Sequence, residues 1–207
     1  MKKICLISML ALAGCKSQQV VEFDSATLAT SGPVEVNVHS FGGNVTIIVD
    51  STVRGTIVSA TQIEDGDGEL PDAVPRMRCT TEIKTGVTGQ IVHVVATCND
   101  NALQLISADI IVRAKSIHGV SVTTQNGDVT LLGISGAIDI QTKDGNVRVV
   151  TPLMMNERVS IENRRGDIVY RVRGESSGII DATAMYGEVA FDLKEGDATI
   201  LPGSTGD

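Results

Sequence analysis

Glycine recurs in a fixed hydrophobic register through the second half of this chain of 207 residues. Apolar side chains stand seven and five residues before each of four glycines, and two and four residues after it, at all sixteen positions. The four glycines, each inside a turn tripeptide, are Gly127, Gly145, Gly166 and Gly187. Alternating apolar residues that repeat around turns predict a β-structure built from equivalent units.

Two further glycines fit the template and refine it. Gly136 lies midway between Gly127 and Gly145, so one strand with its turn takes nine residues and two make a coil of 18. Gly43 marks a unit far upstream. The later glycine spacings are 21 residues, and the excess falls at residues 151–156 and 173–177. Both insertions therefore enlarge the same one of the two turns, and the turn with the repeating glycine stays constant.

The repeat is compatible with two architectures. Hairpins with Asn-Gly turns would give an antiparallel β-sandwich, whereas stacked equivalent turns give a parallel β-solenoid. Insertions confined to alternate turns and a core of Val, Ile and Leu favour the all-β parallel solenoid. We expect it to cover residues 33–201, followed by a flexible tail at 202–207.

Two cysteines frame a predicted hairpin in the middle of the chain. Cys79 and Cys98 flank two alternating segments joined by the turn at 86–89. The other two cysteines lie in or directly after an export signal, and export places a thiol pair where disulfides persist. We expect a Cys79–Cys98 disulfide that links the strands of this hairpin.

The N-terminus has the pattern of an export signal. Two lysines precede an apolar run, and the tetrad that ends at Cys15 resembles a bacterial lipobox. The resemblance implies that a signal peptide, residues 1–14, is removed and that Cys15 carries lipid. Residues 15–32 are expected to form an irregular tether, and Lys16 after the cysteine implies the outer membrane.

Charge and composition exclude some partners. Loss of residues 1–14 removes Lys2 and Lys3 and no acid, so the net charge moves from −8 to −8 − 2 = −10. An acidic chain of this kind lacks the basic footprint that nucleic acid needs. Aromatic residues make up 2% of the chain, which disfavours an extended sugar-stacking platform.

Each candidate catalytic or metal-binding group can be explained by a structural role instead. Asp128, Asp167 and Glu188 follow repeating glycines and would stack in a solenoid, but turn chemistry accounts for them. The same holds for the Arg165-Gly166-Asp167 tripeptide. The acidic stretch within 63–75 lacks the glycine that an EF-hand needs at its sixth position. We therefore predict no catalytic residue, no metal site and no cofactor.

The segment Val120–Gly133, followed by Ile138–Val149, resembles the bacterial family of putative adhesins called DUF4097, and the stretch Val34–Asp50 is similar. The resemblance covers roughly residues 33–200. It implies a right-handed β-helix-like domain, exported or attached to a membrane, with no catalytic residues to transfer.

These observations lead to one functional expectation and one alternative. We expect a lipid-anchored envelope protein whose solenoid binds an envelope protein or glycan, adheres or gives structural support. The enlarged turns at 151–156 and 173–177 are the expected contact sites. The alternative is a carbohydrate-active β-helix enzyme that acts on envelope polysaccharide. An arginine-rich stretch, residues 148–173, is expected to be balanced by Glu157, Glu162 and Glu175.

Overall fold

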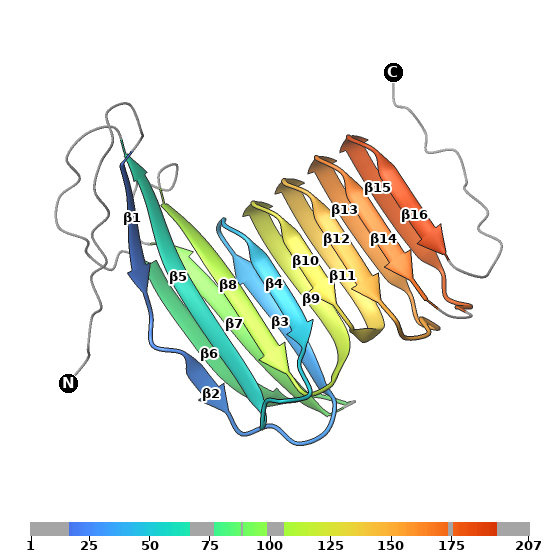
Figure 1. The fold of residues 1–207 in the computed structure, drawn as a ribbon, viewed down its shortest axis with the longest axis horizontal. Helices are drawn as coiled ribbons and strands as arrows, with labels where there is room; N and C mark the ends of the chain where they lie inside the picture. Colours follow the sequence, from blue (N-terminus) through green and yellow to red (C-terminus); the bar gives the residue numbers. More distant parts are fainter. Residues whose placement is uncertain (1–16, 67–76, 88, 99–105, 174–175, 194–207) are drawn as a thin grey trace.

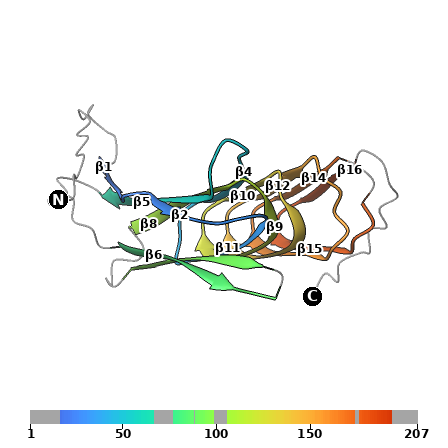
Figure 2. The ribbon, with the colours of Figure 1, turned by 90° about the horizontal axis from the view of Figure 1, so that it is seen from below.

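The computed structural model describes residues 17–66, 77–87, 89–98, 106–173 and 176–193, and their secondary structure is all β-strand (Figure 1). The strands form two sheets that face each other (Figure 2). The nine-stranded sheet contains, in spatial order, β1 (Ser17–Glu22), β5 (Thr56–Gly66), β8 (Ile106–Ala114), β4 (Val45–Val49), β10 (Val129–Leu132), β12 (Val147–Thr151), β14 (Ile168–Val172) and β16 (Val189–Leu193), with β2 (Ala26–Leu28) also on β5. The seven-stranded sheet contains β15 (Ile180–Tyr186), β13 (Val159–Arg165), β11 (Ser135–Asp144), β9 (Ile117–Asn126), β3 (Val34–Ser40), β7 (Gln90–Cys98) and β6 (Met77–Thr85).

Each repeat unit forms one coil with one strand in each sheet. Coils β9–β10, β11–β12, β13–β14 and β15–β16 pair in parallel, and equivalent template positions align, as Val129 does with Val147 and Val147 with Ile168. The inward aliphatic side chains of the first three of these coils are fully buried, and they stack into a continuous core. The predicted parallel solenoid is confirmed, and the antiparallel sandwich is wrong for these coils.

The coils are not stacked in chain order. The unit predicted around Gly43 is the coil β3–β4, and it lies directly on β9–β10, with Val45 beside Val129. On its other side lies β7–β8, which pairs in parallel with β3 and β4. The coil β7–β8 was missed by the sequence analysis because Ala108, not glycine, stands beside Gly43.

Antiparallel strands close the end of the solenoid next to β7–β8. Strand β6 pairs with β7, β5 pairs with β8, and both β1 and β2 pair with β5. The expectation of an irregular tether at 15–32 is therefore wrong for β1 and β2. Strand β5 extends to Gly66, so the predicted acidic loop begins later than expected, and its residues 67–75 lie outside the described residues.

The predicted disulfide is wrong, although the hairpin is present. The turn closes through a hydrogen bond from the Gly86 amide to the Gly89 carbonyl, 2.7 Å long. This turn sets a register in which Cys79 faces Ala96 and Cys98 faces Met77, so the two thiols are staggered by two residues and are free. Burial raises the pKa of the Cys79 thiol, which keeps it protonated.

Candidate functional site

The constant turns stack into a glycine column at one side of the solenoid. Gly127 and Gly145 have φ of 108° and 130°, a region that side chains rarely adopt. A Cβ on Gly145 would lie well within van der Waals contact distance of the Gly127 carbonyl oxygen, and one on Gly127 would meet Gly43 in the same way. Neighbouring coils therefore approach so closely that Gly43, Gly127 and Gly145 have no room for a side chain. Gly166 and Gly187 continue the column.

Gly136 stands apart from this column. It lies in β11, where the register with β9 shifts between Ser135 and Ile138. A Cβ there would lie 2.6 Å from the Gly119 amide nitrogen. Its glycine therefore serves a bulge and not the constant turn.

The residues that follow the glycines form a ladder of side-chain to backbone hydrogen bonds. The Asp128 carboxylate accepts from the Asn146 amide at 2.7 Å, and the Asn146 side-chain oxygen accepts from the Asp167 amide at 3.0 Å. Asp167 in turn accepts from the Glu188 amide at 2.9 Å. The first five rungs alternate between aspartate and asparagine, which keeps like charges from facing each other directly, whereas the last two, Asp167 and Glu188, are both acidic. The rungs in spatial order are Asp109, Asn44, Asp128, Asn146, Asp167 and Glu188.

This ladder gives the predicted carboxylate row a structural role. Asp128 and Asp167 are engaged by amides of the next coil, and Arg165 of the Arg-Gly-Asp tripeptide pairs with Asp144 at 2.5 Å. A glycosidase needs two carboxylates free to act as acid and base or nucleophile. In the described residues the ladder offers no such pair, and no group of three His, Cys, Asp or Glu side chains is placed to hold a metal.

A second polar column was missed by the sequence analysis. The residues three positions before the glycines are buried, and Asn163 donates from its amide to the carbonyls of Gly145 and Gly166 at 2.8 and 2.9 Å. This offset has the same inward parity as the apolar positions seven and five residues before the glycine, but the template counted apolar residues alone and so left the polar position out. Its members are Ser40, Thr124, Thr142 and Asn163.

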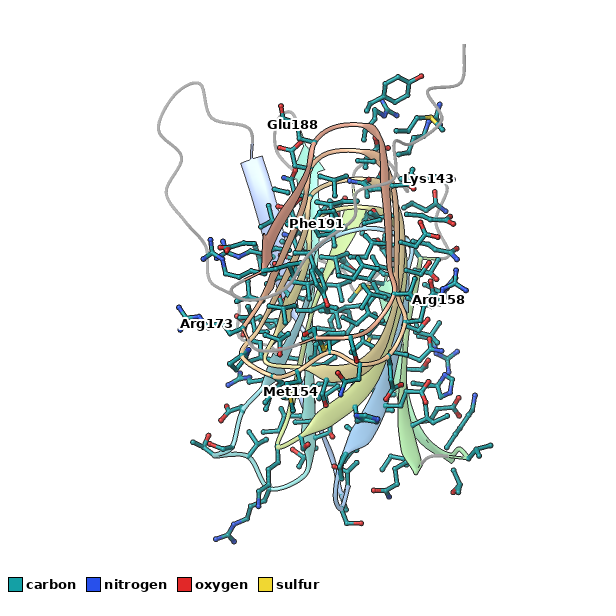
Figure 3. All side chains as sticks on the ribbon, turned by 90° about the vertical axis from the view of Figure 1, so that its right-hand side faces the viewer. Lys143, Met154, Arg158, Arg173, Glu188 and Phe191 are labelled. Carbon is teal, nitrogen blue, oxygen red and sulfur yellow. The ribbon has the colours of Figure 1, made fainter. Side chains whose placement is uncertain are left out.

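The enlarged turns lie at the opposite side of each coil from the glycine column, as Met154 and Glu188 show in Figure 3. They span residues 152–158, between β12 and β13, and 173–179, between β14 and β15. The predicted placement of both insertions in the same turn is confirmed. The Met155 amide donates to the Ser176 hydroxyl at 3.0 Å, and the Gly178 amide donates to the Met155 carbonyl at 3.2 Å. The two turns are therefore bonded to each other.

One turn places apolar side chains in solvent above a buried anchor. Met155 is 1% exposed, whereas its neighbours Leu153 and Met154 are 44% and 60% exposed. The buried Thr151 hydroxyl donates to the Ile134 carbonyl at 2.7 Å and accepts from the Leu153 amide at 3.1 Å. We call Leu153, Met154 and the turn backbone that holds them the inserted-turn surface. It is fixed by hydrogen bonds and shows apolar side chains to solvent.

A Ser-His-Glu cluster lies beside this surface. His118 contacts the Ser135 hydroxyl through Nδ1 at 3.2 Å and the Glu157 carboxylate through Nε2 at 2.9 Å. The Ser135 hydroxyl also donates to the Ile117 carbonyl at 3.1 Å. The cluster links three neighbouring coils.

The arginines are neutralised differently from the prediction. Arg171 pairs with Asp192 at 2.7 Å, and Arg158 lies 3.8 Å from Asp181. Aspartates of the next coil balance these two charges, and Glu157 pairs with His118 instead, whereas Glu175 lies outside the described residues. The reason is the parallel register, which puts Arg171 directly beside Asp192 and Arg158 diagonal to Asp181, two residues before the aligned Ser160.

The stacked coils, glycine column and hydrogen-bond ladder define a protein of the parallel β-solenoid class. The chain belongs to the Toastrack DUF4097 family, whose sequence model matches residues 34–200. Comparison with curated proteins finds no match.

A solved structure of low sequence identity shares the fold. The crystal structure of a putative cell adhesion protein from Clostridium sporogenes is similar with a TM-score of 0.59 and 8% identity, over 87% of this chain and 100% of that one. A putative adhesin from Bacteroides fragilis gives a TM-score of 0.33 at 12% identity, over 86% and 98% of the two chains. In the part of the chain that the structure describes, no helix is long and apolar enough to cross a membrane.

Proposed function

We propose that this protein is a non-catalytic binding module of the bacterial cell envelope, and that the inserted-turn surface contacts its partner, an envelope protein or glycan. The observation that carries the proposal is the exposure of Leu153 and Met154 on a turn whose backbone is fixed. A fixed turn loses little conformational entropy on binding, and exposed aliphatic side chains supply contact area. The cell adhesion description of the similar Clostridium sporogenes structure supports a binding role.

A photocrosslinking amino acid in place of Met154 is expected to yield a specific adduct in intact cells. The adduct should disappear when Leu153 is also replaced by serine, because the partner then loses apolar contact on the same turn. The matched control places the crosslinker at Val87, a fully exposed apolar residue on the hairpin turn. Equal adducts at both positions, or none at Met154, would contradict the proposal.

The proposed location is the periplasmic or outer face of the outer membrane, with a lipid on Cys15. Residues 1–16 lie outside the described residues, so the support is the sequence pattern alone. Several acyl chains hold a protein at a membrane where one is marginal. Cells fed radioactive palmitate are expected to label the wild-type protein and not the Cys15→Ala variant. Equal labelling of the two proteins would refute the anchor.

A further inference from the structure

The coil β15–β16 ends the solenoid on the side away from the antiparallel strands (Figure 1). Within the described residues, no strand pairs with the outer edge of either β15 or β16. Ile180 and Phe191 are only partly buried, whereas their counterparts one coil earlier, Val159 and Tyr170, are 0% exposed. Figure 3 looks onto this end and shows Phe191 inside the coil. The core is therefore open here, and a solenoid end of this kind needs a cover.

At three outward positions, the last coil carries a different kind of side chain from the coil before it. The parallel register places Tyr186 beside Arg165, and the same offset of 21 residues relates the other two pairs. Ile179, Met185 and Tyr186 are 73%, 65% and 63% exposed. An arginine in one coil is thus followed by a large apolar or aromatic residue in the next at both ends of β15, with Asp181 and Thr183 at the outward positions between them. The pairs are Arg158 and Ile179, Arg164 and Met185, and Arg165 and Tyr186.

Charges at the two ends of the solenoid are arranged differently. Asp181 and Asp192 of the last coil lie beside arginines of the coil below. These arginines offset the charge of the two aspartates, so the same acidic surface of a second copy can approach them. At the opposite end, the edge strand β6 exposes Arg78, Glu82 and Lys84, which is how edge strands resist pairing. Within the described residues, the β15–β16 end has the more exposed apolar side chains, because Val20 and Ile83 on the opposite edge strands β1 and β6 are 47% and 37% exposed.

We propose that a second copy of this chain covers the β15–β16 end, related by a twofold axis that sets β15 against β15 and β16 against β16 in antiparallel pairs. A twofold contact joins the same patch on both copies, so the apolar end of one copy meets the apolar end of the other. A head-to-tail stack would instead set this apolar end against the charged opposite end. The amides of Val159, Gly166 and Ile168 each donate to the next coil. Their counterparts Ile180, Gly187 and Val189 would donate to the second copy, and both sheets would continue across the contact.

The size of the end surface predicts a weak dimer. Strands of seven residues are roughly 23 Å long, and facing sheets lie about 10 Å apart. With side chains, the end offers on the order of 450 Å² per copy, which is well below the roughly 800 Å² of a standard stable interface. We therefore expect a reversible dimer with a dissociation constant on the order of micromolar or weaker.

Sedimentation equilibrium of the full chain with Cys15→Ser, which removes the proposed lipid, measures this association. The average mass is expected to rise from monomer to dimer with concentration. The substitutions Ile179→Arg, Met185→Arg and Tyr186→Arg restore the residues of the preceding coil, which already tolerates arginine there. Together they are expected to raise the dissociation constant more than about tenfold. Val87→Arg is the control and should leave it unchanged.

A backbone variant separates strand pairing from simple apolar contact. Ala184→Pro removes an amide that points outward from β15, where proline is tolerated on an edge strand. It should weaken the dimer without loss of the folded circular dichroism spectrum. A monomer at all concentrations, a dimer that survives the arginine variant, or a dimer that survives Ala184→Pro would each overturn the proposal. A chain that dimerises only when truncated after Leu193 would overturn it as well, because its own residues 194–207 would then be the cover.

Discussion

Gly145→Ala is expected to lower the free energy of unfolding by about 4 kcal/mol, among the largest effects of a single substitution. Alanine would be strained at a φ of 130°, at a cost of roughly 1–3 kcal/mol. The added Cβ would also collide with the Gly127 carbonyl, a backbone atom that cannot rotate away. The two coils would have to separate, which weakens their hydrogen bonds. Urea unfolding followed by circular dichroism measures the change.

Gly32→Ala is the matched control for this prediction. Gly32 has a φ of 76°, but a Cβ there would meet nothing within 4 Å. Gly32→Ala introduces backbone strain without a steric clash, so we expect it to lower the free energy of unfolding by roughly 1–2 kcal/mol. Equal losses at Gly32 and Gly145 would show that the close stacking of the turns contributes nothing.

The second large effect is expected for Leu131→Ala, at about 3–4 kcal/mol. Leu131 is 0% exposed and lies between Ile47 and Val149 of the neighbouring coils. Removal of its side chain leaves a cavity that a stacked core cannot easily fill, which adds to the lost transfer free energy. Urea unfolding at dilute, monomeric concentration measures the loss.

Leu193→Ala provides the same chemical change at the open end of the solenoid. Leu193 in β16 is only partly buried, so truncation should cost about 1 kcal/mol in the monomer. A loss at Leu193 as large as that at Leu131 would mean that the β15–β16 end is closed within one chain. That result would also remove the basis for the second copy.

The architecture was predictable because the repeat carries two independent signals. The alternating apolar residues set the strands, and the glycine with its following Asp or Asn sets a turn that stacks. Residues such as Gly43 could be assigned to the array across a long insertion because the template is strict. The separation of constant and enlarged turns followed from spacing alone.

The missed features depend on contacts between segments distant in sequence. The coil β7–β8 has Ala108 where other coils have glycine, so no local pattern identified it. The order of the coils places β3–β4 between two later coils, which periodicity cannot show. The cysteine prediction was wrong because it assumed a register, and a shift of the turn by one residue changes which residues face each other. The His118, Ser135 and Glu157 cluster likewise arises only when coils stack.

The placement of β3–β4 against β9–β10 is the central claim, and a designed crosslink tests it most directly. Thr46 and Thr130 are aligned on the outer face of adjacent parallel strands. Strands lie about 4.8 Å apart, within the Cα separation that a disulfide spans. In a chain whose four native cysteines are serine, Thr46→Cys with Thr130→Cys is expected to form an intramolecular disulfide on mild oxidation, seen by peptide mass analysis. Thr46→Cys with Arg148→Cys, one strand further away, should remain reduced. Two free thiols in the first variant, or a disulfide only in the second, would contradict the stacked order of the coils.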